Sequence, residues 1–159
     1  MRKFEKISFE QFKKDIKDDI NLYNNYIKPK RNTKYSAGYD FYLPCDVALE
    51  PYGDSPIIQT GVKAYMPEDE VLLLFVRSSV GIMKNVTLSN SVGVIDASYC
   101  DNPDNEGNIG LKLHNNSPHT VTFKKGERIM QGVFVKYGVV DDDNVTEERK
   151  GGIGSTGKE

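Results

Sequence analysis

The sequence is poor in cysteine and has no tryptophan at all. Cys45 and Cys100 are too few and too isolated for a disulfide scaffold or a zinc knuckle, so we expect both thiols to be reduced. No apolar run approaches the length of a membrane span, and the first residues, Met1–Lys6, lack the apolar segment of a secretion signal. These absences predict a cytoplasmic protein without a membrane partner.

An excess of positive charge is missing as well. The formal net charge is -2 at pH 7 and the isoelectric point is about 5.8, which argues against a basic face that binds nucleic acid. We therefore expect no nucleic-acid partner. At 159 residues and 17.9 kDa, the chain is long enough for one domain with its own core and too short for a second.

Long amphipathic helices are absent after about residue 35, where short β-type runs alternate with turn residues. The strongly apolar run Val71–Val76 predicts a buried central strand, and the alternating run Gly132–Tyr137 predicts a half-buried one. Turn clusters such as Pro51–Pro56 separate these runs. Such a density of short strands predicts an all-β fold, of the kind found in jelly-roll-like barrels.

The two ends of the chain differ from this middle part. Ser8 and Gln11 form a plausible capping box, and Phe9, Phe12 and Ile16 share one helix face, so one short helix is predicted near residues 9–19. Residues 141–159 are rich in aspartate and glycine and have too little apolar area to order themselves. We expect an N-terminal extension (1–30) packed on the domain, a β-barrel (31–140), and a flexible glycine-rich arm (141–159).

Three segments carry groups that suit a nucleoside triphosphate. Asp96 follows an apolar pair, so one carboxylate emerges at the mouth of a strand, where partial burial can hold it as a base toward water. Arg77 precedes two hydroxyl side chains and can donate to phosphate oxygens. The glycine-rich stretch Gly151–Gly157 supplies backbone N–H groups that can close over anionic oxygens.

Taken in order, these segments resemble the five motifs of the trimeric dUTP pyrophosphatases, the dUTPase family. The resemblance covers roughly Thr33–Lys158, and its motifs are Ser36–Phe41, Arg77–Gly81, Asn90–Tyr99, Gly126–Gln131 and Arg149–Gly157. It implies a distorted jelly-roll-like β-barrel, the dUTPase-like β-clip. It also implies that the chain hydrolyses dUTP to dUMP and pyrophosphate by in-line attack of water on the α-phosphorus. That reaction would lower dUTP and supply dUMP for thymidylate synthesis.

The family resemblance further implies Mg²⁺ as cofactor and a homotrimer whose active sites are shared. The third motif would come from one chain, the first, second and fourth from another, and the arm from the third. Asp40 is expected near Mg²⁺ through water rather than as a direct ligand, or else as a turn residue after Gly38. Arg128 is expected to make a structural ion pair.

The resemblance also assigns the residues of the site. Asp96 would take the proton of the attacking water. Tyr99 would stack on the deoxyribose and leave no space for a 2′-hydroxyl, although a core tyrosine is common in β domains. The other residues implied to contact the substrate are Arg77, Ser78, Ser79, Asn90, Gly93, Val94, Ile95, Gly110, Gln131, Arg149, Gly152, Ile153, Gly154, Ser155 and Thr156.

Two departures from the family pattern concern the arm. Ile153 stands where an aromatic residue commonly stacks over uracil, so the arm would close by aliphatic contact. Arg149 lies one residue nearer the glycines than in the commonest spacing, which leaves its phosphate contact open. A third feature, the segment 100–106, enlarges the hairpin after Tyr99 and would shape the pocket rim, bind a partner, or be a solvated loop.

Two alternative functions remain. The dCTP deaminases share this fold, but they carry a catalytic glutamate in the strand after the third motif, and Lys112 occupies that position here. A lysine cannot replace that carboxylate. The second alternative is a dUTPase-like regulatory protein that uses closure of its arm to engage a partner. Since all motif residues for hydrolysis are present, such a role would accompany activity.

Overall fold

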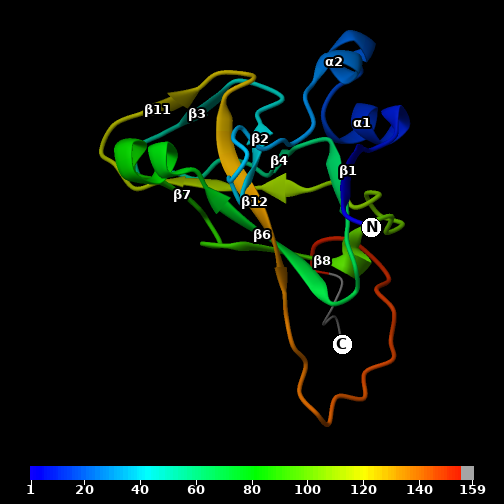
Figure 1. The fold of residues 1–159 in the computed structure, drawn as a ribbon. Coiled ribbons are helices and arrows are strands. Elements are labelled where there is room, and N and C mark those ends of the chain that lie inside the picture. Colours follow the sequence, from blue (N-terminus) through cyan, green and yellow to red (C-terminus); the bar gives the residue numbers. More distant parts are fainter. Residues whose placement is uncertain (155–159) are drawn as a thin grey trace.

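The computed structural model describes residues 1–154, and its regular structure is dominated by short antiparallel strands (Figure 1). The all-β class predicted from the sequence is confirmed. In chain order the elements are β1 (Lys3–Lys6), α1 (Phe9–Asp15), α2 (Ile20–Asn25), β2 (Tyr39–Tyr42), β3 (Val47–Leu49), β4 (Ile58–Gln59), β5 (Val62–Tyr65), β6 (Glu70–Val76), the π-helix η1 (Ser79–Met83), β7 (Val86–Leu88), β8 (Gly93–Asp96), the 3₁₀-helix η2 (Ala97–Tyr99), β9 (Gly110–Leu111), β10 (Leu113–Asn115), β11 (Val121–Phe123) and β12 (Arg128–Lys136).

The largest sheet has four strands in the order β2-β12-β6-β8. Strand β6 is the predicted central strand: it pairs with β12 on one side and β8 on the other, and Leu72 and Leu74 on it are buried. Strand β8 pairs with β6 and forms an edge of this sheet. An edge strand leaves alternate backbone N–H and C=O groups free to bind something other than a neighbouring strand.

The other strands form four two-stranded sheets around the same core. The pairs are β1-β5, β10-β7, β11-β3 and β4-β9. Buried apolar side chains from nearly all of these strands, such as Phe4, Leu113 and Phe123, pack into one cluster with those of the large sheet. Over residues 1–154 no continuous ladder joins these sheets into a closed barrel, so the predicted barrel is distorted to the point of being a set of packed sheets.

The N-terminal segment holds two helices where the sequence predicted one. A single helix over residues 9–19 would end in aspartates, which oppose the helix dipole at a C-terminus. Asp19 instead caps the second helix, accepting from the backbone N–H of Leu22 at 2.9 Å. Ser8 caps α1 as predicted, accepting from Gln11 N at 3.1 Å, but its own backbone N–H donates to Glu106 instead of Gln11.

The segment is also part of the β fold. Strand β1 pairs with β5 over its full length, from Lys3 opposite Tyr65 to Lys6 opposite Val62. Arg2 forms an ion pair with Glu70, whose side chain is buried at the start of β6, and this contact lowers the pKa of the Glu70 carboxyl. The extension is therefore built into the domain rather than attached to its surface.

After β12 the chain leaves the sheet, and residues 137–154 contain no helix or strand. Figure 1 shows this arm running away from β12 and then turning back toward β8. Residues 137–148 are exposed, whereas Gly151 and Gly152 are buried. No helix in the described residues 1–154 has the length and apolar character needed to cross a membrane.

Phe12 tests whether the extension contributes to the stability of the whole domain. Its side chain is fully buried, stacks on Tyr26 at 5.4 Å between ring centroids and meets Tyr23 edge-on at 5.2 Å. We expect Phe12→Ala to lower the free energy of unfolding by about 3 kcal/mol, because the lost contacts leave a cavity. Urea unfolding at fixed protein concentration measures this. The partly exposed Phe9 is the matched control, and equal small losses in both variants would show that the extension is dispensable.

Candidate functional site

A cavity of about 540 Å³ lies beside β8. Its walls come mainly from four parts of the chain: the segment from the end of β7 through β8, η2, strand β9 with Lys112, and the end of the arm. Leu74 and Met130 of the central sheet also line it. The predicted site residues in its lining are Asn90, Gly93, Val94, Ile95, Asp96, Tyr99, Gly110, Arg149, Ile153 and Gly154.

The segment between β7 and β8 forms one wall and contains a tight turn. Ser91 has a φ of 65°, and its N–H donates to Leu88 O at 2.9 Å, which turns the chain before β8. Gly93 lies directly against β6, where a Cβ atom would meet two atoms of Leu74 at 3.0 Å. A glycine here lets β8 approach the central strand closely. This turn and β8 therefore place Asn90 and residues 93–95 in the lining of the cavity.

Asp96 ends β8 at the mouth of the cavity, with a side chain that is 52% exposed. One of its oxygens accepts from Arg149 Nη2 at 2.8 Å. Arg149 also lies 5.5 Å from the centre of the Tyr99 ring and donates to Ser98 Oγ and to the carbonyls of the arm. A half-exposed carboxylate beside a guanidinium suits proton transfer from water next to a bound anion.

Tyr99 is buried and held by two hydrogen bonds. Its hydroxyl donates to Asn108 O at 3.0 Å and accepts from Asn105 Nδ2 at 2.9 Å. Burial raises the pKa of this phenol, so it stays neutral at physiological pH. The ring is thus a fixed, uncharged wall of the cavity.

A second cluster lies outside this cavity. Asp40 on β2 is buried and accepts from Arg77 Nε and Arg128 Nη1, both at 3.1 Å, and from the amide of Asn32. The ion pair expected of Arg128 is confirmed. Arg77, Ser79 and Arg128 line a separate hollow on η1 and the turn before β12.

Strand β6 separates the two clusters. Asp96 is opposite Val71 near its start, while Arg77 follows its last residue, Val76. At about 3.3 Å per residue, six residues of strand span about 20 Å. A single chain therefore brings together the predicted site residues near Asp96. The other predicted residues lie away from this cavity: Arg77, Ser78, Ser79, Gln131 and Asp40.

Only some of the predicted arm residues lie at the cavity. Ile153 and Gly154 lie at the cavity, and Gly152 donates its N–H to Asp104 at 2.8 Å. Ser155 and Thr156 fall outside the described residues. The sequence pointed to the segment 100–106 as a pocket rim, a partner site or a solvated loop, but it gave Asp104 and Asn105 no individual role and did not indicate Asn108. A loop so rich in aspartate and asparagine is a signal for side chains that bond to backbone.

The described residues contain no preformed metal site and no disulfide. Within residues 1–154 no group of three or more His, Cys, Asp or Glu side chains is arranged to hold a metal ion. Both cysteines are free thiols, as expected. Burial raises the pKa of Cys100 to about 11, which makes it a poor nucleophile at neutral pH.

The fold and the cavity define a β-sheet domain with a nucleotide-sized pocket, whose edge-strand backbone, buried tyrosine and adjacent carboxylate and guanidinium suit a phosphorylated ligand. The family model for dUTPase matches residues 24–157 of the sequence. The chain belongs to the dUTPase family.

Individual relatives agree with this assignment. The chain is 48% identical to the deoxyuridine 5'-triphosphate nucleotidohydrolase of Lactococcus lactis, over 81% of this chain and 87% of that one. It is 40% identical to the dUTPase of Streptococcus mutans, whose crystal structure superposes with a TM-score of 0.70 over 87% of this chain and 98% of that one. A dUTPase of Staphylococcus bacteriophage 80alpha, solved with dUpNHpp, has 25% identity and a TM-score of 0.68, over 92% of this chain and 89% of that one.

Asp40 offers a test of what the buried ion pairs contribute. In Asp40→Asn, an amide NH₂ would face a guanidinium, so we expect the unfolding free energy to fall by about 2 kcal/mol, less than for a fully enclosed pair because both arginines keep contact with water. Urea unfolding in EDTA without nucleotide measures this. Asp46→Asn is the control, since Asp46 is exposed and pairs with Lys124 at 3.0 Å. Unchanged stability with reduced activity would instead assign Asp40 a role confined to the metal.

Proposed function

We propose that the chain hydrolyses dUTP to dUMP and pyrophosphate, with Asp96 as the base. Membership of the dUTPase family supports the reaction. The observation that carries the assignment of the base is the position of Asp96: it is half exposed at the mouth of the cavity, beside the buried Tyr99 and the guanidinium of Arg149. Uracil would enter along β8, whose free backbone groups can match its donors and acceptors.

The base and sugar would be recognised by contacts that one chain already brings together. The Asn90 amide would offer a donor and an acceptor to the uracil edge, and a close fit of the segment from Asn90 to Ile95 around the base would exclude the methyl group of thymine. Tyr99 would lie against the deoxyribose, where a 2′-hydroxyl would collide with a ring that cannot move without breaking two hydrogen bonds. Discrimination against ribose is therefore steric.

In the chemical step, Asp96 would accept a proton from a water placed in line with the α-phosphorus. The water oxygen forms a bond to that phosphorus as the bond to the bridging oxygen of the β-phosphate breaks, and pyrophosphate leaves. Arg149 and the backbone N–H groups of Gly152–Gly154, with Ser155 and Thr156, would bind phosphate oxygens. Arg77, Ser78, Ser79 and Gln131 would complete this shell.

Mg²⁺ fits the donors of this site when the triphosphate supplies most of its ligands. The described residues contain no carboxylate cage, and both oxygens of Asp40 already accept from nitrogen donors. A carboxylate in that position can still order a hydration shell through its remaining lone pairs. Bound with substrate, the ion would neutralise negative charge on the phosphates.

The site would be shared between subunits of a homotrimer. Asp96 and Arg77 are about 20 Å apart along β6, too far for the base and the phosphate donors of one chain to act on one phosphorus atom. A symmetric trimer would bring Arg77 of one chain to Asp96 of the next, and each interface would repeat the same complete site.

The deaminase alternative is not favoured. Lys112 lies at the cavity in the position of the deaminase glutamate, and its ammonium is 3.7 Å from Asp54. A cation held there cannot serve as the base that deamination requires. A regulatory role that accompanies activity is a separate proposal, to which the described residues add no specific observation.

Replacing Asp96 tests the function and the base together. We expect Asp96→Asn to lower kcat for dUTP by on the order of a hundredfold or more, while affinity for a non-hydrolysable analogue stays nearly unchanged. Pyrophosphate release from dUTP, UTP, dCTP and dTTP measures both selectivity and turnover, with Asp142→Asn in the exposed arm as the control. A wild-type protein inactive on dUTP would reject the function, and an Asp96→Asn protein near wild-type kcat would reject the base.

Mixed trimers test whether the site is shared. Asp96→Asn and Arg77→Ala chains, each inactive alone, should regain part of the activity when refolded together, because some interfaces then join an intact Asp96 to an intact Arg77. Activity that stays at the level of the separate variants in verified mixed trimers contradicts sharing. A chain truncated after Glu148, mixed with Asp96→Asn, reports on the arm: rescue assigns the arm and Asp96 of one site to different subunits, and absence of rescue assigns them to the same subunit.

A further inference from the structure

The loop between Tyr99 and β9 is held almost entirely by polar contacts. Apart from Pro103, residues 101–108 carry no apolar side chain, and we call them the polar loop. Asp101 and Glu106 have φ values of 58°, a left-handed conformation that costs free energy in non-glycine residues. With no apolar surface of its own to bury, the loop depends on hydrogen bonds for its shape.

Helix α1 supplies hydrogen-bonding partners at both of its ends. At its start, the backbone N–H and hydroxyl of Ser8 donate to the two carboxylate oxygens of Glu106, at 2.9 and 2.5 Å. At its end, Asp15 accepts from Asn108 Nδ2 at 2.9 Å. Asn108 is fully buried, and its other amide atom accepts from Gly61 N at 2.9 Å. The helix thus clamps the polar loop at two points.

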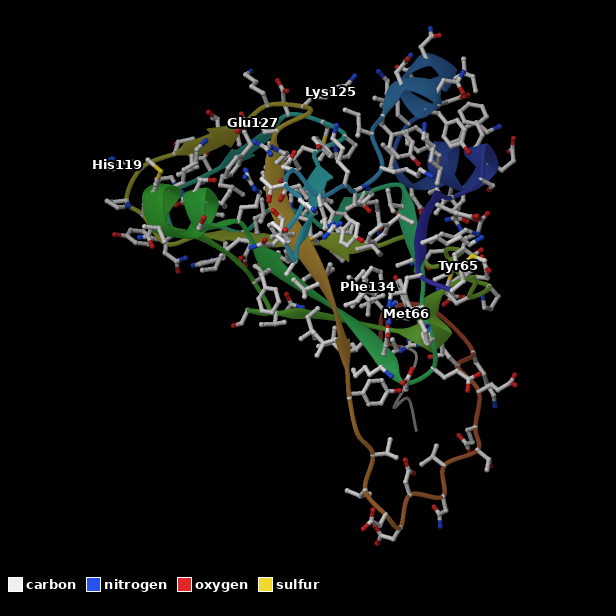
Figure 2. All side chains as sticks on the ribbon, viewed as in Figure 1. Tyr65, Met66, His119, Lys125, Glu127 and Phe134 are labelled. Carbon is white, nitrogen blue, oxygen red and sulfur yellow. The ribbon has the colours of Figure 1, made fainter. Side chains whose placement is uncertain are left out.

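The opposite side of the loop is fastened to β5. The hydroxyl of Tyr65, labelled in Figure 2, donates to Asp101 at 2.8 Å, and Lys63 forms an ion pair with the same carboxylate. Lys63 also lies 4.0 Å from Glu106, and Gly61 before β5 donates to Asn108, so this side of the loop is held without α1. The contacts from α1 add to this support at Glu106 and Asn108, so their loss would loosen residues 105–108 most.

The clamped part of the loop holds the site. Asn108 O accepts from the hydroxyl of Tyr99, and Asn105 Nδ2 donates to that same hydroxyl. Asn102 Nδ2 donates to the Tyr99 carbonyl at 2.8 Å, and Asp104 accepts from Gly152 of the arm. Both the tyrosine and the seat of the arm thus depend on a loop that α1 keeps in shape.

We propose that Asp15 and Glu106 are positioning residues through which the N-terminal helix sets the sugar selectivity of the enzyme. The inference rests on the proposed function, in which Tyr99 excludes the 2′-hydroxyl. A tyrosine free to shift would admit ribose more readily. The position of the base would be unaffected, since Asp96 belongs to β8 and not to the loop, and a weaker seat for the arm at Asp104 would affect both nucleotides alike and leave their ratio unchanged.

The test compares kcat/KM for dUTP with that for UTP in four variants. Asp15→Ala removes the acceptor for Asn108, whereas Asp15→Asn keeps an acceptor oxygen. Asp19→Ala removes the cap of the neighbouring helix α2 without touching the polar loop, and so controls for general loosening of the extension. Tyr99→Ala removes the wall itself. Hydrogen exchange of the amides at 101–108 reports the shape of the loop directly.

We expect Asp15→Ala to lower the dUTP/UTP ratio of kcat/KM by about two- to thirtyfold, with faster exchange of the loop amides. Any loss through the arm should lower kcat/KM for both nucleotides by the same factor. Asp15→Asn should restore most of the ratio. Asp19→Ala should leave it at the wild-type value even where the melting temperature falls. If Asp15→Ala does not fold, Glu106→Gln, which weakens the other clamp, should lower the ratio in the same direction.

Asp15→Ala or Glu106→Gln with wild-type selectivity, or a loss of selectivity in Asp19→Ala equal to that in Asp15→Ala, would overturn the inference. These results are distinct from failure of the proposed function. In that case wild type would not prefer dUTP, or Tyr99→Ala would keep the wild-type ratio whatever the helix variants did.

Discussion

The pairing of β6 with β12 on one side and β8 on the other fixes the positions of Asp96 and Arg77, the carboxylate and the guanidinium at the two ends of the central strand. Its register sets Gly93 opposite Leu74 and Asp96 opposite Val71, so the edge strand carries its carboxylate to the start of β6. Because side chains alternate along a strand, a slip of one residue would turn Asp96 to the other face of the sheet. Gly93 opposes that slip, because any other residue of β8 placed opposite Leu74 would bring a Cβ atom to about 3.0 Å from the Leu74 side chain. The apolar core thereby enforces the geometry of a polar site.

In the proposed mechanism, the same strand keeps the two active groups of one chain apart. Arg77 emerges beyond its far end, held by Asp40, and the paired, largely buried seven-residue strand holds Arg77 and Asp96 at opposite ends. Association of identical chains would solve this, because each copy offers Asp96 at one end of β6 and Arg77 at the other. The rigid central sheet would then be an advantage. In the proposed trimer, two groups that must cooperate would each be held on a stiff element and brought together by association of subunits.

The sequence predicted what depends on local pattern and on ordered motifs. The apolar run at Val71–Val76 and the resemblance over five motifs gave the central strand, the all-β class and the family. The sequence did not predict the break between α1 and α2, which depends on Asp19 capping a new helix instead of ending the old one. It also gave β1 no role, because four residues with one buried side chain carry too weak a pattern to indicate a strand. For the site, the structure brings the predicted residues near Asp96 together, but their separation from Arg77 by about 20 Å along β6 depends on strand register, which a single sequence does not contain.

The contacts of the polar loop explain why the sequence predicts no functional role for the N-terminal extension. The hydrogen bond from Asn108 to Asp15 joins residues 93 positions apart, and the one from Ser8 to Glu106 joins residues 98 positions apart. No local spacing in the sequence can therefore predict either bond. The apolar face of α1 predicts an amphipathic helix that buries Phe12. The same pattern does not indicate what the polar residues at its two ends contact. Those ends matter because the loop cannot stabilise itself by burial, and its hydrogen bonds must compete with water unless a rigid partner holds them. A helix packed through Phe12 is such a partner. The extension therefore joins the apolar core to the wall of the cavity by a short path: a buried aromatic residue fixes the helix, the helix fixes the polar loop, and the loop fixes Tyr99.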